Sequence, residues 1–200
     1  MRAELHGVSP LAVAALLASA SLQAAPPAAA QDLESLAPAL AFLEPEARDD
    51  ATILLPGPDG DRVLRQGSGL HICLADEPGD DRLSVTCYHR ALDPLLALER
   101  RLRRDGLRGD EFSARVQAEI DAGRVSVPSG AYQVSVSGDD ARATGQPAGL
   151  TVYHLVYLPG ATANEVGLSA EREPGLPYLH HAGRYDAHVM WSEAAASASH

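Results

Sequence analysis

The stretch Thr151-Val152-Tyr153-His154-Leu155-Val156-Tyr157-Leu158 is the most strand-like run of this 200-residue chain. Its β-branched and aromatic residues predict a strand, which Pro159-Gly160 ends. Upstream, Tyr132-Gln133-Val134-Ser135-Val136 alternates apolar and polar residues, as does a strand that is buried on one face. A final strand is expected at residues 187–191.

Two helices are expected before these strands. Asp93-Pro94 is a helix cap followed by proline at the first helical position, and Gly106 ends this helix. A second helix is predicted from Asp110 to Gly123. The first helix has a leucine stripe on one side and an arginine cluster on the other: Arg100, Arg101, Arg103 and Arg104. Such a cluster could bind an anion, but a solvated polar face is the preferred interpretation.

The N-terminal third is predicted to be rich in strands. Strand-like runs at residues 52–55, 62–65, 70–75 and 83–89 are separated by turn residues, which predicts an antiparallel meander of about four strands. Leucines at helical spacing before them predict a short helix within residues 33–43. The fold class expected from this order is α+β, with a mostly antiparallel sheet, two central helices and a short N-terminal helix.

The first thirty residues have the features of a secretory signal peptide. Leu11 to Ala18 is apolar and uncharged, and small residues follow it up to Ala28-Ala29-Ala30. The apolar run is too short to span a membrane, and no transmembrane segment is expected in the mature chain. We therefore expect a signal peptide at 1–30, a single α+β domain at 31–193 and a disordered tail at 194–200, in a secreted or periplasmic protein.

Cys73 and Cys87 are expected to form a disulfide, because two cysteines in an exported chain are most simply a bridge. The residues between them are turn-forming, so the bridge is expected to join adjacent strands across a hairpin. In the chain-entropy account it stabilises the fold by about 3 kcal/mol. The spacing is not that of a C-x-x-C redox motif.

The charge of the chain argues against nucleic acid as a partner. The formal net charge is −11, and all sixteen basic residues are arginine. A surface this acidic repels phosphate backbones.

Several segments together resemble an uncharacterised family of secreted bacterial proteins with a cysteine pair and a C-terminal His-x-Met segment. The resembling segments are Ala51-Thr52-Ile53-Leu54, Gly67 to Cys73, Cys87 with the helices that follow, the His154 strand, Pro177-Tyr178-Leu179, and Ala187-His188-Val189-Met190. The chain departs from the family in Leu70-His71-Ile72-Cys73, where an aromatic residue is expected before the cysteine. The resemblance implies export and a cysteine pair, and it implies no activity.

Histidines are the candidate functional residues. His188 and Met190 lie two apart on an expected strand and so share a face, and His154 lies in the middle of another strand. If these strands pair, His154, His188 and Met190 could form a copper or zinc site. The alternative is that these residues belong to the core. His180 and His181 are expected to point in opposite directions if extended, which disfavours a shared site.

Three classes of function remain open. The leading hypothesis is a non-catalytic binding or envelope protein whose ligand or protein partner is unknown. It rests on the apolar leader, the cysteine pair and the lack of a specific catalytic motif. Aromatic residues in the final third suit a binding surface, but filling the core is the preferred interpretation of them. The first alternative is the metal-binding protein. The second is a hydrolase with His154 or His188 as base, Asp186 as acid, and Ser135 or Ser137 as nucleophile. The cofactor is unknown, and no nucleophile motif supports the hydrolase.

Overall fold

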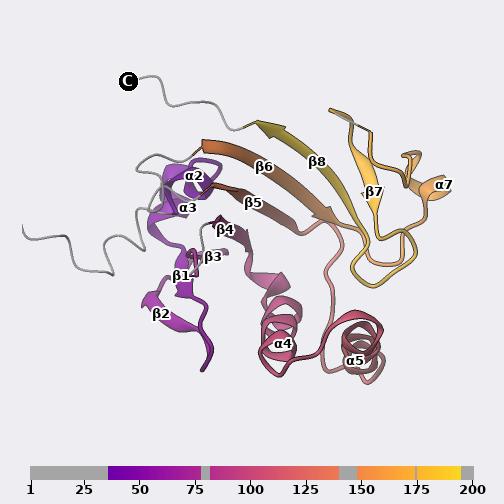
Figure 1. Cartoon of the computed structure of the whole chain (residues 1–200), viewed down its shortest axis with the longest axis horizontal. Helices are drawn as coiled ribbons and strands as arrows, with labels where there is room; N and C mark the ends of the chain where they lie inside the picture. The colour runs from indigo at the N-terminus through magenta and orange to yellow at the C-terminus, as the bar shows by residue number, and fades with distance from the viewer. Residues whose placement is uncertain (1–35, 78–81, 140–147, 174, 195–200) are drawn as a thin grey trace, which may run out of the picture.

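The computed structural model describes residues 36–77, 82–139, 148–173 and 175–194 (Figure 1). Its eight strands form one sheet in the order β2-β1-β3-β4-β5-β6-β8-β7. The strands are β1 (Thr52–Leu55), β2 (Arg62–Arg65), β3 (His71–Leu74), β4 (Arg82–His89), β5 (Tyr132–Asp139), β6 (Ala148–Tyr157), β7 (Tyr178–His180) and β8 (His188–Ala194). The helices are α2 (Ala37–Leu40), α3 (Pro45–Asp49), α4 (Asp93–Arg104), α5 (Gly109–Asp121) and α7 (Ala163–Val166). The predicted α+β class is confirmed.

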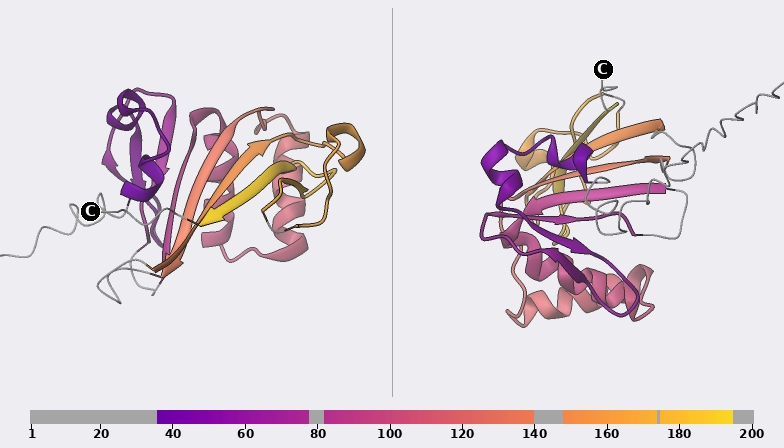
Figure 2. Two further views of the ribbon diagram at one scale, coloured as in Figure 1. Left: turned by 90° about the horizontal axis from the view of Figure 1, so that it is seen from above. Right: turned by 90° about the vertical axis from the view of Figure 1, so that its left-hand side faces the viewer.

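Alternating residues of the central strands divide the core between the two faces of the sheet. Val134 and Val136 of β5 and Val152 of β6 pack in one cluster with residues of α2. Leu155 and Tyr157 of β6 pack in a second cluster with the buried stripes of α4 and α5. Accordingly, α2 lies on one side of the sheet, and α4 and α5 lie on the other (Figure 2). We refer to these sides as the α2 face and the α4 face.

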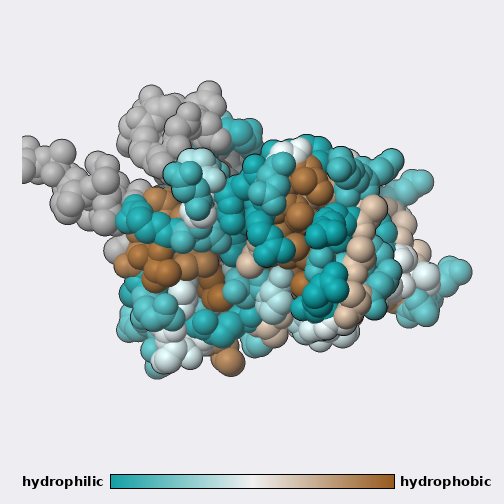
Figure 3. All heavy atoms as spheres, turned by 90° about the horizontal axis from the view of Figure 1, so that it is seen from below, coloured by the Kyte–Doolittle hydropathy of each residue, from teal (hydrophilic) through white to brown (hydrophobic). Residues whose placement is uncertain are grey.

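The two central helices were correctly predicted. Proline occupies the first turn of α4, and Leu95, Leu98 and Leu102 are buried, as the leucine stripe required. Gly123 follows α5 with φ 68°, a conformation that glycine adopts at the end of a helix without a steric penalty. The surface that α4 and α5 present is mostly hydrophilic, and its hydrophobic residues form separate patches (Figure 3).

The predicted antiparallel meander is wrong in its first half. β1 pairs with β2 antiparallel, but its other neighbour is β3, and that pair is parallel. After β2 the chain crosses beside the segment that precedes β1, where the Gly69 N–H donates to the Asp50 carbonyl. This crossing returns the chain to the free edge of β1, so β3 runs in the same direction as β1. The later strand pairs β3–β4, β4–β5 and β5–β6 are antiparallel as expected.

The disulfide between Cys73 and Cys87 is present and lies where it was expected. The two residues are direct partners in the antiparallel β3–β4 pair. Both are almost completely buried, in the core of the α2 face.

The chain ends differ in part from expectation. A single short helix was expected within residues 33–43, but the structure has two short helices, and the second begins at Pro45. Ala194 belongs to β8 and not to the predicted tail. The predicted signal peptide, 1–30, and residues 195–200 lie outside the described residues. Among the described helices, none is long and apolar enough to cross a membrane.

Candidate metal centre

The sheet separates the two histidines that the sequence suggested for a common site. His154 of β6 lies opposite Trp191 of β8, whereas His188 of β8 lies opposite Tyr157 of β6. Cross-strand partners share a face, and residues three apart in one strand do not. His154 therefore points to the α2 face and His188 to the α4 face, so the predicted set of His154, His188 and Met190 does not come together.

His154 is held by partners on every side. Its Nδ1 lies 2.5 Å from the Tyr132 hydroxyl, and its Nε2 lies 3.2 Å from a carboxylate oxygen of Glu193. Its ring stacks on that of Trp191, with centroids 4.9 Å apart. Because both ring nitrogens are engaged, neither is available to a metal or to an external substrate.

The sheet also separates Ser135 and His154, which the hydrolase hypothesis offered as nucleophile and base. Ser135 lies opposite Tyr153, the neighbour of His154 in β6, so Ser135 and His154 are on opposite faces. The Ser135 hydroxyl is bonded to that of Thr86 at 2.8 Å. The hydrolase therefore gains no support from this pair.

His188 and Met190 do share a face, as predicted from their spacing. Their partners in the adjacent strand β7 are His180 and Tyr178. The Met190 sulfur lies 3.7 Å from the Tyr178 hydroxyl, and His188 faces His180 instead. Met190 therefore contacts Tyr178, its partner in the adjacent strand, whereas His188 contacts His180.

A cluster of three histidines forms where β7 turns back into β8. One ring nitrogen from each of His180, His181 and His188 lies within 4.8 Å of those from the other two. The rings of His180 and His181 stack with centroids 3.8 Å apart, and the ring of His188 meets that of His180 edge to face at 5.0 Å. His188 is buried, and the other two are partly exposed.

The expectation that His180 and His181 point apart was wrong because the strand ends between them. β7 stops at His180, and His181 has φ 56°. This left-handed conformation is uncommon for a residue with a Cβ, and such residues are frequent at functional sites. It turns the His181 ring back over that of His180.

Asp186 orients two of the three rings. The His181 Nδ1 lies 2.6 Å from a carboxylate oxygen of Asp186, and the His188 Nδ1 donates to the Asp186 carbonyl at 2.7 Å. With its proton on Nδ1, a neutral imidazole presents the lone pair of Nε2. Metal-binding histidines are typically held in this way by a carboxylate or a carbonyl behind the ring.

A ring nitrogen of His180 faces a ring nitrogen of His188. The His180 Nδ1 lies 3.3 Å from the His188 Nε2. Two imidazole nitrogens bound to one tetrahedral zinc ion at 2.0–2.1 Å are separated by roughly 3.4 Å. In the absence of metal, the same separation allows the His180 N–H to donate to His188. Binding a metal through these two atoms requires His180 to move its proton from Nδ1 to Nε2.

Burial favours the neutral form of the two histidines that face each other. It is the largest cause of the lowered pKa of His188, and the nearby His181 lowers it further. The pKa of His180 is lowered for the same reasons, with His188 as an additional cause. Both are lowered from 6.5, so both rings are neutral at pH 7 and can act as ligands.

Asp186, which holds two of the histidines, is itself held by a neighbouring arginine. Arg184 Nε donates to the other carboxylate oxygen of Asp186 at 3.0 Å. Glu99 of α4 is close enough for its carboxylate and that of Asp186 to repel, although burial is the main reason that the pKa of Glu99 is raised. The cluster therefore has its own anchored carboxylate and lies against α4.

Sequence reasoning identified His188 but missed its partners. The adjacent pair His180-His181 was visible in the sequence, and so was Asp186. A turn signal existed in Gly183, which has φ 77° in the tight connection between β7 and β8. Reading residues 178–190 as a hairpin would have placed all three histidines at one end of it.

Comparisons with protein-family models, with curated proteins and with solved structures found no match for this chain.

A second, separate pair of histidines provides a test of pH dependence. His71 of β3 faces His89 of β4, and burial, followed by the charge of His89, lowers the pKa of His71. The unfolded chain takes up a proton near pH 6.5 that folded His71 resists, so the free energy of unfolding should fall as the pH drops below about 6.5. His71→Gln should reduce this slope, as measured by denaturant unfolding between pH 7.5 and 5.5. If the free energy of unfolding of His71→Gln depends on pH as it does in the wild type, His71 is not the source of this dependence.

Proposed function

We propose that this is an exported metal-binding protein that holds zinc or copper with His180, His181 and His188. The proposal is carried by one observation: three imidazoles converge within 4.8 Å, and the Nδ1 atoms of two of them are engaged by Asp186. It keeps the metal-binding hypothesis of the sequence and replaces His154 and Met190 by His180, at the end of β7, and His181, which follows it.

The ligand type favours zinc or copper over other common cations. Imidazole nitrogen suits zinc, copper, iron and nickel, whereas calcium and magnesium take oxygen ligands. Three protein ligands leave a further coordination position on a tetrahedral ion. The disulfide and the apolar leader support export, because disulfides persist in the oxidising environment outside the cytoplasm.

Titration of the purified, chelator-treated chain with Zn²⁺ and with Cu²⁺ tests the proposal. We expect one ion to bind per chain, as measured by calorimetry and by elemental analysis after gel filtration. His181→Asn is the most informative variant, because asparagine tolerates the left-handed backbone while it removes the imidazole. It should weaken binding by more than about 100-fold, and Asp186→Asn by about 10–100-fold, the range for an outer partner.

The matched control is His154→Ala, which removes an imidazole from the opposite face. It should leave the stoichiometry and affinity unchanged. Thermal unfolding of each variant without metal separates a lost ligand from a lost fold. Binding that survives His181→Asn, or that His154→Ala abolishes, would refute the assignment.

A further inference from the structure

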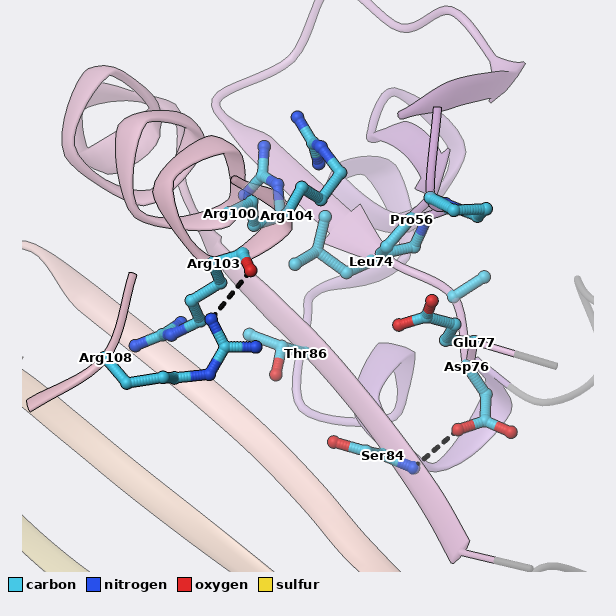
Figure 4. Close-up of a pocket in the computed structure, with 13 residues that line it drawn as sticks. Pro56, Leu74, Asp76, Glu77, Ser84, Thr86, Arg100, Arg103, Arg104 and Arg108 are labelled. Atoms are coloured by element: carbon cyan, nitrogen blue, oxygen red, sulfur yellow. Dashed lines mark hydrogen bonds between the residues drawn. The ribbon is translucent and has the colours of Figure 1, made fainter. Parts of the chain in front are cut away.

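A cleft of about 610 Å³ lies between α4 and the strands β3 and β4, and none of the three clustered histidines lines it. Four arginines line it: Arg100, Arg103 and Arg104 of α4, and Arg108 of the following turn (Figure 4). Asp76, Glu77 and Ser84 line the side facing them. Three of the four arginines that the sequence placed on a solvated face thus form one wall of a cleft, and Arg101 is not among the residues that line it.

Two of the arginines are fixed in place by a single carboxylate. Arg100 Nε and Arg104 Nη1 each donate to a different oxygen of Asp61, both at 2.8 Å. Arg100 also donates to the Tyr88 hydroxyl at 3.1 Å and is largely buried. These two guanidinium groups form the rigid part of the wall and are already neutralised in part.

The other two arginines offer donors to a ligand. Arg108 Nη1 donates to the carbonyls of Arg103 and Leu107, both at 2.7 Å. Within the described part of the chain, its Nε and Nη2 have no hydrogen-bond partner. The Arg103 guanidinium lies over the ring of Phe112 and shares one bond with Glu99, which leaves Nε and Nη1 without a partner among the same residues.

A cluster of this kind is unusual on a chain of this charge. The chain carries a net charge of −11, yet this cleft has four arginines against two carboxylates in its lining. An excess of cationic side chains in a concave site attracts ligands of the opposite charge. Guanidinium groups match the paired oxygens of carboxylates and phosphates.

We propose that this cleft binds a small organic anion, with its carboxylate or phosphate group at Arg103 and Arg108. Glu77, on the side of the cleft that faces the arginines, suits a ligand whose other end carries hydroxyl or amino donors. The proposal does not depend on the metal site.

Calorimetric titration with inorganic phosphate and with citrate, at constant ionic strength set with chloride, tests the proposal on chelator-treated protein. We expect saturable binding at one site per chain for at least one probe. Binding of phosphate alone identifies a phosphate ester as the ligand class, and binding of citrate alone identifies a carboxylate. Arg108→Gln and Arg103→Gln should each weaken binding about tenfold or more.

Arg115→Gln is the matched control, because Arg115 is exposed on α5, is paired with Glu119 at 3.4 Å and does not line the cleft. It makes the same change in net charge and should leave the affinity unchanged. His181→Asn should also leave it unchanged, which separates this cleft from the metal site. Absence of saturable binding by both probes, or equal weakening by Arg115→Gln, would overturn the proposal.

Discussion

Replacing both Cys73 and Cys87 with alanine is expected to lower the free energy of unfolding by about 3 kcal/mol. The bridge closes a loop with a sequence separation of 14, and its loss restores freedom to the unfolded chain. Both side chains are buried beside Val85 and Val134 in the core of the α2 face, so lost packing adds to the effect. Equilibrium unfolding in urea measures the change.

Reductant provides the control for this prediction. Dithiothreitol should destabilise the wild-type chain by a similar amount and should not affect the double variant. Mass spectrometry after alkylation without reductant should find both thiols blocked in the wild type. Thiols that react under these conditions would show that the bridge is not formed in solution.

Gly67→Ala is expected to destabilise the fold by at least about 3 kcal/mol, above the usual cost of overpacking. A Cβ at this position would lie 2.1 Å from the Asp50 carbonyl oxygen and 2.6 Å from the Ala51 carbonyl carbon. Both are backbone atoms, so no side-chain rotation relieves the clash. The Thr52 hydroxyl, which bonds to the backbone of Gly67, would also be displaced.

Ser68→Ala is the matched control for Gly67→Ala. Ser68 is the next residue, and it is exposed with one 3.3 Å contact to the Asp50 carboxylate. Its substitution should change the free energy of unfolding by less than about 0.5 kcal/mol. Thermal and urea unfolding of both variants tests the pair. A Gly67→Ala chain as stable as wild type would show that the crossing beside Asp50 is not as close as described.

Strands with alternating apolar and polar residues could be predicted from the sequence, but which strands pair, and in which direction, could not always be predicted. Tyr132 to Val136 reads as half-buried because β5 packs one face on α2, and that pattern is local. The parallel β1–β3 pair depends on a close backbone approach at Gly67, which no periodicity encodes. Gly67 lies among the turn residues expected between two strand-like runs, whereas in the structure the crossing requires that it has no Cβ.

The candidate site was only partly predictable for the same reason. The two-residue spacing of His188 and Met190 placed them on one face, because side chains alternate along a strand. The face of His154 relative to His188 depends on the register of β6 against β8, and a shift of one residue would reverse it. The approach of His181 depends on one left-handed residue at the end of β7.

By itself, the sequence determined the α+β class, the two central helices and the bridge between Cys73 and Cys87. These follow from local periodicity, from capping residues and from having only two cysteines. Only the tertiary structure decided which histidines meet and that the α4 arginines line a cleft. Both depend on contacts between segments far apart in the sequence, and strand register and backbone turns set those contacts.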